Sequence, residues 1–173
     1  MNVQMTARIA LAAILVTACE REDVDGESPL EGAWKVVSIN VTGPASAANT
    51  TVQPSLYLFG DKHYSMMLVT GNQPRTLSAR DSATDAERLA AYDSFIANTG
   101  TYEAVDSTLT IHPMVARDPN FMAGGADKYT FRVSGDTLWL SNSGTDIRTM
   151  IGGQLVGPSQ TPNAQALVLV RQE

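Results

Sequence analysis

The stretch Glu31-Gly32-Ala33-Trp34-Lys35-Val36-Val37-Ser38-Ile39-Asn40-Val41 decides the fold of this chain. It is the first strong β run, dense in β-branched residues, and it opens with a Gly-x-Trp motif. A glycine two residues before a buried tryptophan lets another part of the chain come close to the backbone. The stretch therefore predicts a strand from about Gly32 to Thr42, with Trp34 in the protein core.

Length and charge limit the class of protein. The chain has 173 residues, which suits one domain with a sizeable core. Its apolar content is ordinary, which excludes both a disordered chain and a protein with several membrane spans. The formal net charge is −6 and the sequence has no basic patch, which argues against nucleic acid as a partner.

Residues 1–18 predict a targeting segment that is separate from the domain. Arg8 is their only charged residue, and the apolar run from Ile9 to Val16 is too short to span a bilayer but suits the core of a signal peptide. Val16-Thr17-Ala18-Cys19 then resembles the bacterial lipobox, whose cysteine is acylated. Cys19 is the only cysteine, so no internal disulfide competes for it. We expect lipidation of Cys19 and a stable membrane anchor through its acyl chains.

Residues 19–29 are polar and charged and end in Pro29, so they predict a flexible tether in front of a single domain over residues 30–173. Glu20 stands where an aspartate after the lipobox cysteine is associated with retention in the inner membrane. The resemblance to lipoproteins therefore implies a protein of the cell envelope, anchored in the outer membrane and facing the periplasm.

Short β runs separated by turn residues follow along the rest of the chain. They are Ser55–Phe59, His63–Val69, Gly100–Val105, Thr108–Met114, Lys128–Ser134, Thr137–Asn142 and Ala166–Val170. With the first strand the count is eight, and most connections are short. An up-and-down antiparallel barrel is the economical arrangement, because it leaves no free strand edge.

The order and spacing of these segments resemble a known family. Residues 54–67, with a hairpin about Gly60-Asp61-Lys62, resemble the second and third strands of the bacterial lipocalin-like domain family, which has a calycin-type barrel. In calycins a tryptophan of the first strand plugs one end of the barrel and an arginine of the last strand covers it; Arg171 stands in that place here. The resemblance implies an all-β, lipocalin-like barrel of about eight strands. The Gly- and Pro-rich segment 143–165 departs from the family pattern and leaves the closure of the barrel open.

The hydrophobic period changes between the third and fourth predicted strands. Thr84-x-x-Glu87 is a capping-box pattern, which predicts a helix from about Asp85 to Ala97. The helix would cover either the barrel mouth or the outer wall of the barrel. Residues 116–127, flexible at both ends and apolar about Phe121, are typical of a mobile flap. The apolar residues at helical spacing are Ala86, Leu89, Tyr92 and Ile96.

Alternation along the strands gives two sets of side chains on opposite faces. The first set is Leu109, Ile111, Tyr129, Phe131, Val133, Leu138, Leu140, Leu167 and Leu169, and the second is His112, Met114, Arg132 and Trp139. Either the first set faces the interior, with Trp139 and Met114 under the helix or flap, or the second set lines a binding pocket. The remaining alternative is that His112 and Arg132 are surface residues paired with acids.

The candidate ligand-binding residues are Tyr64, Met66, Tyr102, His112, Arg132 and Trp139. A mostly apolar pocket with a few polar groups is the usual design of a small-molecule site. An arginine can hold a carboxylate through two hydrogen bonds, and methionine adapts its shape to varied ligands. For Met66 and its neighbour Met67, packing in the core is the alternative.

Other chemistries lack their residues in this sequence. His63 and His112 are not at the spacing of metal ligands and no Gly-x-Ser-x-Gly motif occurs, so we expect no metal, no cofactor and no hydrolase chemistry. Three functions stay open. The first is binding of a small hydrophobic molecule, an acid among the candidates, and the second is an isomerase or cyclase in which His112 transfers a proton. The third is a protein-interaction or inhibitor lipoprotein that uses the loops of its barrel.

Overall fold

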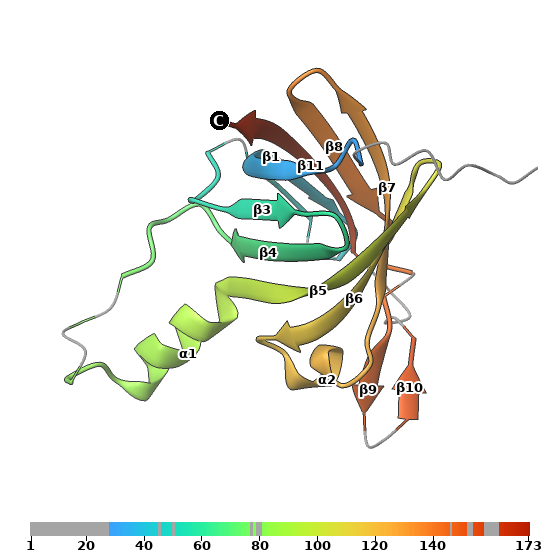
Figure 1. Ribbon diagram of the computed structural model, residues 1–173. Helices are drawn as coiled ribbons and strands as arrows, with labels where there is room; N and C mark the ends of the chain where they lie inside the picture. The colour runs from blue at the N-terminus through green and yellow to red at the C-terminus, as the bar shows by residue number, and fades with distance from the viewer. Residues whose placement is uncertain are drawn as a thin grey trace, which may run out of the picture.

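The computed structural model describes residues 28–44, 46–49, 51–76, 78, 81–145, 147–151, 154–157 and 163–173. The predicted signal peptide, Cys19 and most of the predicted tether lie outside the described residues. Eight antiparallel strands form the barrel (Figure 1). They are β1 (Gly32–Thr42), β3 (Leu56–Phe59), β4 (His63–Val69), β5 (Phe95–Val105), β6 (Thr108–Ala116), β7 (Asp127–Ser134), β8 (Thr137–Asn142) and β11 (Ala164–Gln172).

The strands follow one another around the barrel in chain order, and β11 pairs with β1 to close it. This confirms the predicted up-and-down antiparallel barrel. The strands expected at Gly32–Thr42, His63–Val69 and Thr137–Asn142 have those same bounds in the structure. The segment 143–165 does not interrupt the closure, because β9 (Thr149–Ile151) and β10 (Gln154–Val156) form a separate two-stranded sheet. A short strand, β2 (Ala47–Asn49), pairs with the second half of β1.

The helix between β4 and β5 is shorter than the sequence predicts. Helix α1 covers Asp85–Asp93, and β5 begins at Phe95. The expected helical end at Ile96 and Ala97 is therefore wrong, since both residues pair with β4. The capping box is confirmed: the Thr84 hydroxyl accepts from the Glu87 N–H, and the Glu87 carboxylate accepts from the Thr84 N–H at 2.8 Å.

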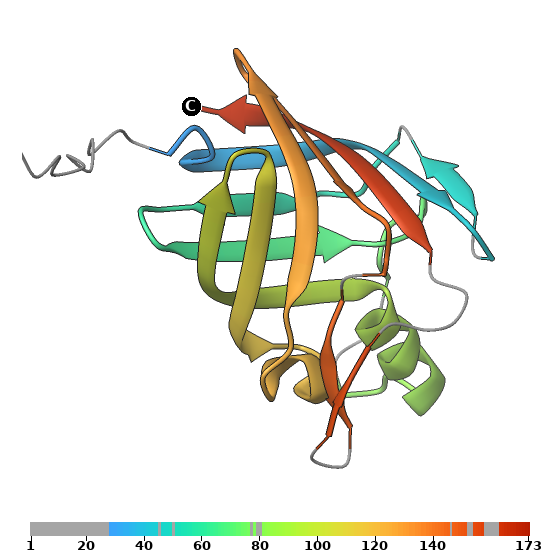
Figure 2. The same cartoon turned by 90° about the vertical axis from the view of Figure 1, so that its right-hand side faces the viewer.

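Helix α1 does not cover the barrel in the way its apolar stripe predicts. None of its residues is buried, and Leu89 is 60% exposed. The predicted flap contains a short helix, α2 (Pro119–Met122), whose N-cap Asp118 accepts from the N–H of Asn120 at 2.9 Å. The mobility of the flap at residues 116–127 stays a prediction. Helices α1 and α2 and the β9–β10 hairpin gather at the lower side of the molecule, away from the C-terminus (Figure 2).

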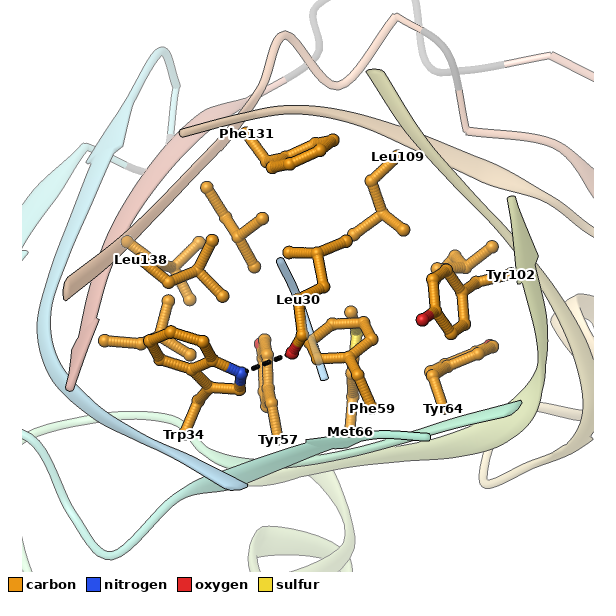
Figure 3. Close-up of a cluster of buried hydrophobic side chains, with 14 of the residues drawn as sticks. Leu30, Trp34, Tyr57, Phe59, Tyr64, Met66, Tyr102, Leu109, Phe131 and Leu138 are labelled. Carbon is orange, nitrogen blue, oxygen red and sulfur yellow. Dashed lines mark hydrogen bonds between the residues drawn. The ribbon is translucent and has the colours of Figure 1, made fainter. Parts of the chain in front are cut away.

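The core fills the barrel around Trp34 (Figure 3). Trp34 is fully buried, and its indole Nε1 donates to the carbonyl oxygen of Leu30 at 2.6 Å. Leu30 is also fully buried, so the segment before β1 plugs this end of the barrel. We call this the closed end, defined by Leu30, Trp34 and Arg171.

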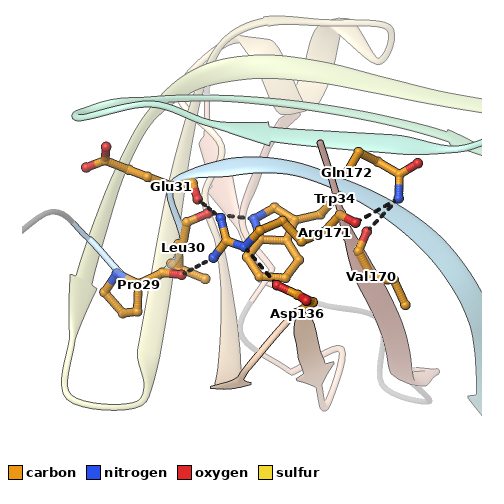
Figure 4. Close-up of polar contacts among 8 residues, drawn as sticks. All are labelled: Pro29, Leu30, Glu31, Trp34, Asp136, Val170, Arg171 and Gln172. Carbon is orange, nitrogen blue, oxygen red and sulfur yellow. Dashed lines mark hydrogen bonds and ion pairs between the residues drawn. The ribbon is translucent and has the colours of Figure 1, made fainter.

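Arg171 covers the indole from outside, as the resemblance to calycins implies. Its guanidinium carbon lies 4.2 Å from the centroid of the Trp34 ring, and Nη1 donates to the carbonyl of Glu31 (Figure 4). Gly32, with φ at +124°, leaves room for this contact, since a Cβ there would lie 2.5 Å from Arg171 Nη1. The glycine of the Gly-x-Trp motif therefore allows the arginine to reach over the backbone.

Candidate functional site

The barrel holds a cavity of about 210 Å³ at the end opposite Trp34, which we call the open end. The strand register places it there, because Leu68 pairs with Ile96 on one wall and Gln165 pairs with Asn142 on the other. The apolar lining is Met66, Leu68, Ile96, Ile111, Phe121 and Ile147. The polar lining is Tyr57, Asn98, Arg117, Asp118, Asp127, Tyr129 and Gln165.

A carboxylate lies in the wall of this cavity. Alternation along β7 turns Asp127 inward together with Phe131, and Asp127 is only 4% exposed. Its Oδ1 accepts from the N–H of Lys128 at 2.8 Å, and its Oδ2 accepts from Nδ2 of Asn142 at 3.0 Å. A buried carboxylate is tolerated when hydrogen bonds hold it in this way.

The negative charge of Asp127 acts on the phenols of the interior. Burial, and after it the charge of Asp127, raises the pKa of Tyr57 and of Tyr64 above the ordinary value of 10.0. The same two causes, in the same order, raise the pKa of Tyr129. Burial and the nearby carboxylate therefore both keep these phenols neutral above the pH at which an exposed phenol ionises.

Two buried polar atoms of the described residues have no hydrogen-bond partner. They are Oδ1 of Asn98, on the wall of the cavity, and the hydroxyl of Tyr64, deeper in the core. A buried acceptor without a partner costs about 1–3 kcal/mol, so an apolar residue at position 98 would stabilise the empty barrel. Groups of this kind call for an explanation, and a ligand is one.

A second hollow of about 410 Å³ adjoins the cavity. It shares three lining residues with the first: Leu68, Ile96 and Gln165. The rest of its wall includes Ile39 and Val41 of β1. Ile96 is 38% exposed, so it lies at the passage between the cavity and solvent. The two hollows therefore lie next to each other, and the second has the size of a small-molecule site.

Helix α1 is attached beside this space through Arg117. The guanidinium carbon of Arg117 lies 4.4 Å from the centroid of the Tyr92 ring, and Nη1 donates to the carbonyl of Tyr92. In return, the Tyr92 hydroxyl donates to the carbonyl of Arg117 at 3.0 Å. Arg117 lines the cavity with its neighbour Asp118, so the contact links α1 to the site.

The structure separates the six residues predicted to bind a ligand. Met66 lines the cavity. Tyr64 and Tyr102 point inward but belong to the core, where the Tyr102 hydroxyl donates to the carbonyl of Gly60 at 2.8 Å. Ligand binding by Tyr64, Met66 or Tyr102 stays a prediction.

His112, Arg132 and Trp139 lie on the outer wall, so the interpretation that places them inside the barrel is wrong. The other strand face, with Leu109, Ile111, Phe131 and the leucines of β8 and β11, fills the interior. Arg132 stacks on Trp139, with its guanidinium carbon 3.5 Å from the ring centroid, rather than pairing with an acid in the described part of the chain. Met114 is 64% exposed, so it does not lie under the helix or flap either.

Sequence reasoning missed the polar lining of the cavity. Asp127 shares the inward face of β7 with Tyr129 and Phe131, and this alternation was the available signal. Asn98 fell between the predicted helix, which ended at Ala97, and the strand predicted from Gly100, and this hid its place on an inward strand face opposite Met66. Gln165 fell just before the predicted last strand.

Other features of the surface are less suited to a hydrophobic molecule. A hollow of about 660 Å³ on the outside of the sheet is lined mainly by Thr, Ser and Asn side chains and Lys128. Within the described residues, no group of three or more His, Cys, Asp and Glu side chains could hold a metal ion. In that same part of the chain no helix combines the length and the apolar character needed to cross a membrane.

The family model of the lipocalin-like domain matches residues 31–153. A solved structure of an uncharacterized protein from Bacteroides eggerthii is similar, with a TM-score of 0.41 and 10% sequence identity over 83% of this chain and 99% of that one. A comparison with curated proteins gave no match.

Proposed function

The chain belongs to the lipocalin-like domain family, and from this premise we propose that it binds a small hydrophobic molecule at the open end of its barrel. The observation that carries the proposal is the cavity of about 210 Å³ behind Ile96, with an apolar wall and a few convergent polar groups. Ligand pockets are built in this way, and they occur in the mouths of β-barrels.

The same observation weighs against the two other functions. The isomerase or cyclase hypothesis gave the proton transfer to His112, and His112 lies exposed on the outer wall, outside the cavity. A barrel used only for protein interaction would have a filled interior. Here the packed core occupies the closed end, whereas the open end has space that continues toward solvent.

Binding of N-phenylnaphthylamine, a neutral apolar dye that fluoresces in apolar surroundings, tests the proposal. The dye should bind the wild-type protein, and Ile96→Trp should abolish the fluorescence, because the indole would occupy the passage shared by the two hollows. Leu58→Trp is the matched control: it adds the same side chain at a position that is also 38% exposed, on the outer face of β3. Equal fluorescence in the two variants would contradict binding at the open end.

We also propose that the protein is a lipoprotein of the cell envelope, anchored through Cys19 and facing the periplasm from the outer membrane. The support is the lipobox-like Val16-Thr17-Ala18-Cys19 after a short apolar run. A barrel on a tether would then hold its ligand beside a membrane. Cys19→Ser should move the full-length protein from the detergent phase to the aqueous phase, and unchanged partitioning would falsify the anchor.

A further inference from the structure

We infer that the cavity selects an apolar ligand whose head is a neutral or cationic hydrogen-bond donor, such as an alcohol or an amine, and that it rejects the corresponding carboxylate. The inference rests on the proposed function, because it assigns a ligand class to the same site. It replaces the acidic ligand that the sequence allowed, since Arg132 was the group expected to hold the acid.

The polar wall that a ligand head would meet includes the amide oxygen of Asn98 and the carboxylates of Asp118 and Asp127. Oδ1 of Asn98 is buried without a partner, so a ligand hydroxyl or ammonium could supply the missing donor. The carboxylate of Asp127 also lines the cavity. Asp127 on β7 pairs with Ile111 on β6, which is another lining residue. A second carboxylate, on Asp118, also lines the cavity.

The cationic contribution to this wall is smaller. Among the described lining residues Arg117 is the basic one, and its guanidinium is stacked on Tyr92 and donates to the Tyr92 carbonyl. The two carboxylates outnumber the single guanidinium, and all three groups already make hydrogen bonds within the protein. Burial, and after it the charge of Asp127, raises the pKa of Tyr57 and of Tyr129, so Asp127 disfavours a second negative charge near these phenols.

Burying a negatively charged ligand head beside another carboxylate is costly. A ligand head that donates a hydrogen bond instead gains a protein acceptor in place of the water that the head loses on binding. A ligand carboxylate would have to enter next to Asp127 and leave Asn98 Oδ1 without its donor. An alcohol pays neither penalty, and an ammonium gains attraction from Asp127. Discrimination between heads on the same apolar chain should therefore be strong.

Displacement of N-phenylnaphthylamine by octanol, octylamine and octanoate at neutral pH tests the inference. These compounds share one apolar chain and differ only in the head. We expect octanol and octylamine to displace the dye at concentrations at least about tenfold lower than octanoate, the ratio that corresponds to one charge-assisted hydrogen bond. Equal displacement by all three, or tighter binding of octanoate, would overturn the inference and leave the proposed function standing.

Asp127→Asn changes the charge of the wall while keeping its shape. The variant should bind octanoate more tightly and octylamine less tightly, each by about tenfold, with little change for octanol. A parallel shift for all three probes would mean that Asp127 has only a structural role, and would contradict the inference.

Asn98→Leu provides a second test that does not depend on the folding of the first variant. Removing the unpaired amide should raise the melting temperature and at the same time weaken the binding of octanol by several-fold. Unchanged octanol binding would overturn the role of Asn98. Failure of the proposed function is distinguishable from these results, because the dye would then bind the Ile96→Trp variant as it binds the wild type.

Discussion

The two ends of the barrel differ in how their polar groups are satisfied. At the closed end the Trp34 indole donates to Leu30, and Arg171 donates to Glu31 while it covers the ring. At the open end Asn98 Oδ1 has no partner and a cavity adjoins it. The other unpartnered atom of the described residues, the Tyr64 hydroxyl, lies deeper in the core, so Asn98 is the one of the two that a ligand in the cavity could satisfy.

The largest expected effect on stability is the difference between replacing Trp34 and replacing Trp139. Trp34→Ala should lower the free energy of unfolding by about 3–5 kcal/mol, because it leaves a cavity in the packed closed end. That is a large part of the stability of an ordinary domain. Trp139→Ala is the control: it removes the same side chain from the outer wall and should cost about 1 kcal/mol, since it loses mainly a cation–π contact. Urea unfolding measures both, and equal losses would contradict the asymmetry.

The two arginines that stack on these rings give a smaller contrast. Arg171→Met should cost about 1.5–3 kcal/mol, because Arg171 donates hydrogen bonds to the carbonyls of Glu31 and Pro29 and also contacts the ring. Arg132→Met should cost less than about 1 kcal/mol and leave octanoate binding unchanged, since Arg132 faces outward. A loss of octanoate binding in Arg132→Met would mean that Arg132 takes part in ligand binding.

The fold was predictable because most strands keep a strict inside–outside alternation. In β4, Tyr64, Met66 and Leu68 are buried and their neighbours are not, and a one-residue shift would expose all three. Alternation fails in β1, where a register shift between Val36 and Ser38 turns the second half of the strand over. A bulge of this kind has no residue signature in the sequence, so the inward place of Ile39 had to come from the structure.

The site was harder to predict, because its residues fit more than one pattern. Ile96 continues the helical spacing of Leu89 and Tyr92, yet it pairs with Leu68 in a strand. Helical periodicity therefore placed the end of the helix too far along the chain, and Asn98 was not recognised as a residue of the barrel. The alternation that identified two strand faces was correct, but composition alone did not decide which face was inside. Burial of the first set decided it.

Alkaline pH should destabilise the barrel through its buried phenols. Tyr57, Tyr64 and Tyr129 have a raised pKa in the folded state, mainly because of burial and secondly because of Asp127. A raised pKa favours the neutral phenol in the fold, so this stability is present below pH 10.0 and is lost as the pH rises above it. Tyrosinate absorbance should show these phenols ionising together with unfolding, whereas ionisation in the folded protein near the ordinary pKa would contradict their burial.

The smallest expected effect concerns the exposed helix α1. Hydrogen bonds from Ser78, followed by those from Thr84, lower the pKa of Glu87 from 4.5 to about 2. A lowered pKa favours the carboxylate in the fold, so this contribution is present above pH 4.5 and is lost as the pH falls toward 2. Glu87→Gln should therefore speed hydrogen exchange in residues 85–93 without changing the urea midpoint, because α1 buries no residue. A lower midpoint would mean that α1 supports the barrel.

We propose that a hydrophobic molecule enters the open end of the barrel and leaves the closed end unchanged. Hydrogen–deuterium exchange with and without N-phenylnaphthylamine tests it most directly. Bound dye should slow exchange in residues 95–98 and 117–127, which border the cavity, and leave residues 30–36 unchanged. Protection confined to residues 128–130 and 141–143, beside the outer polar hollow, would contradict the claim.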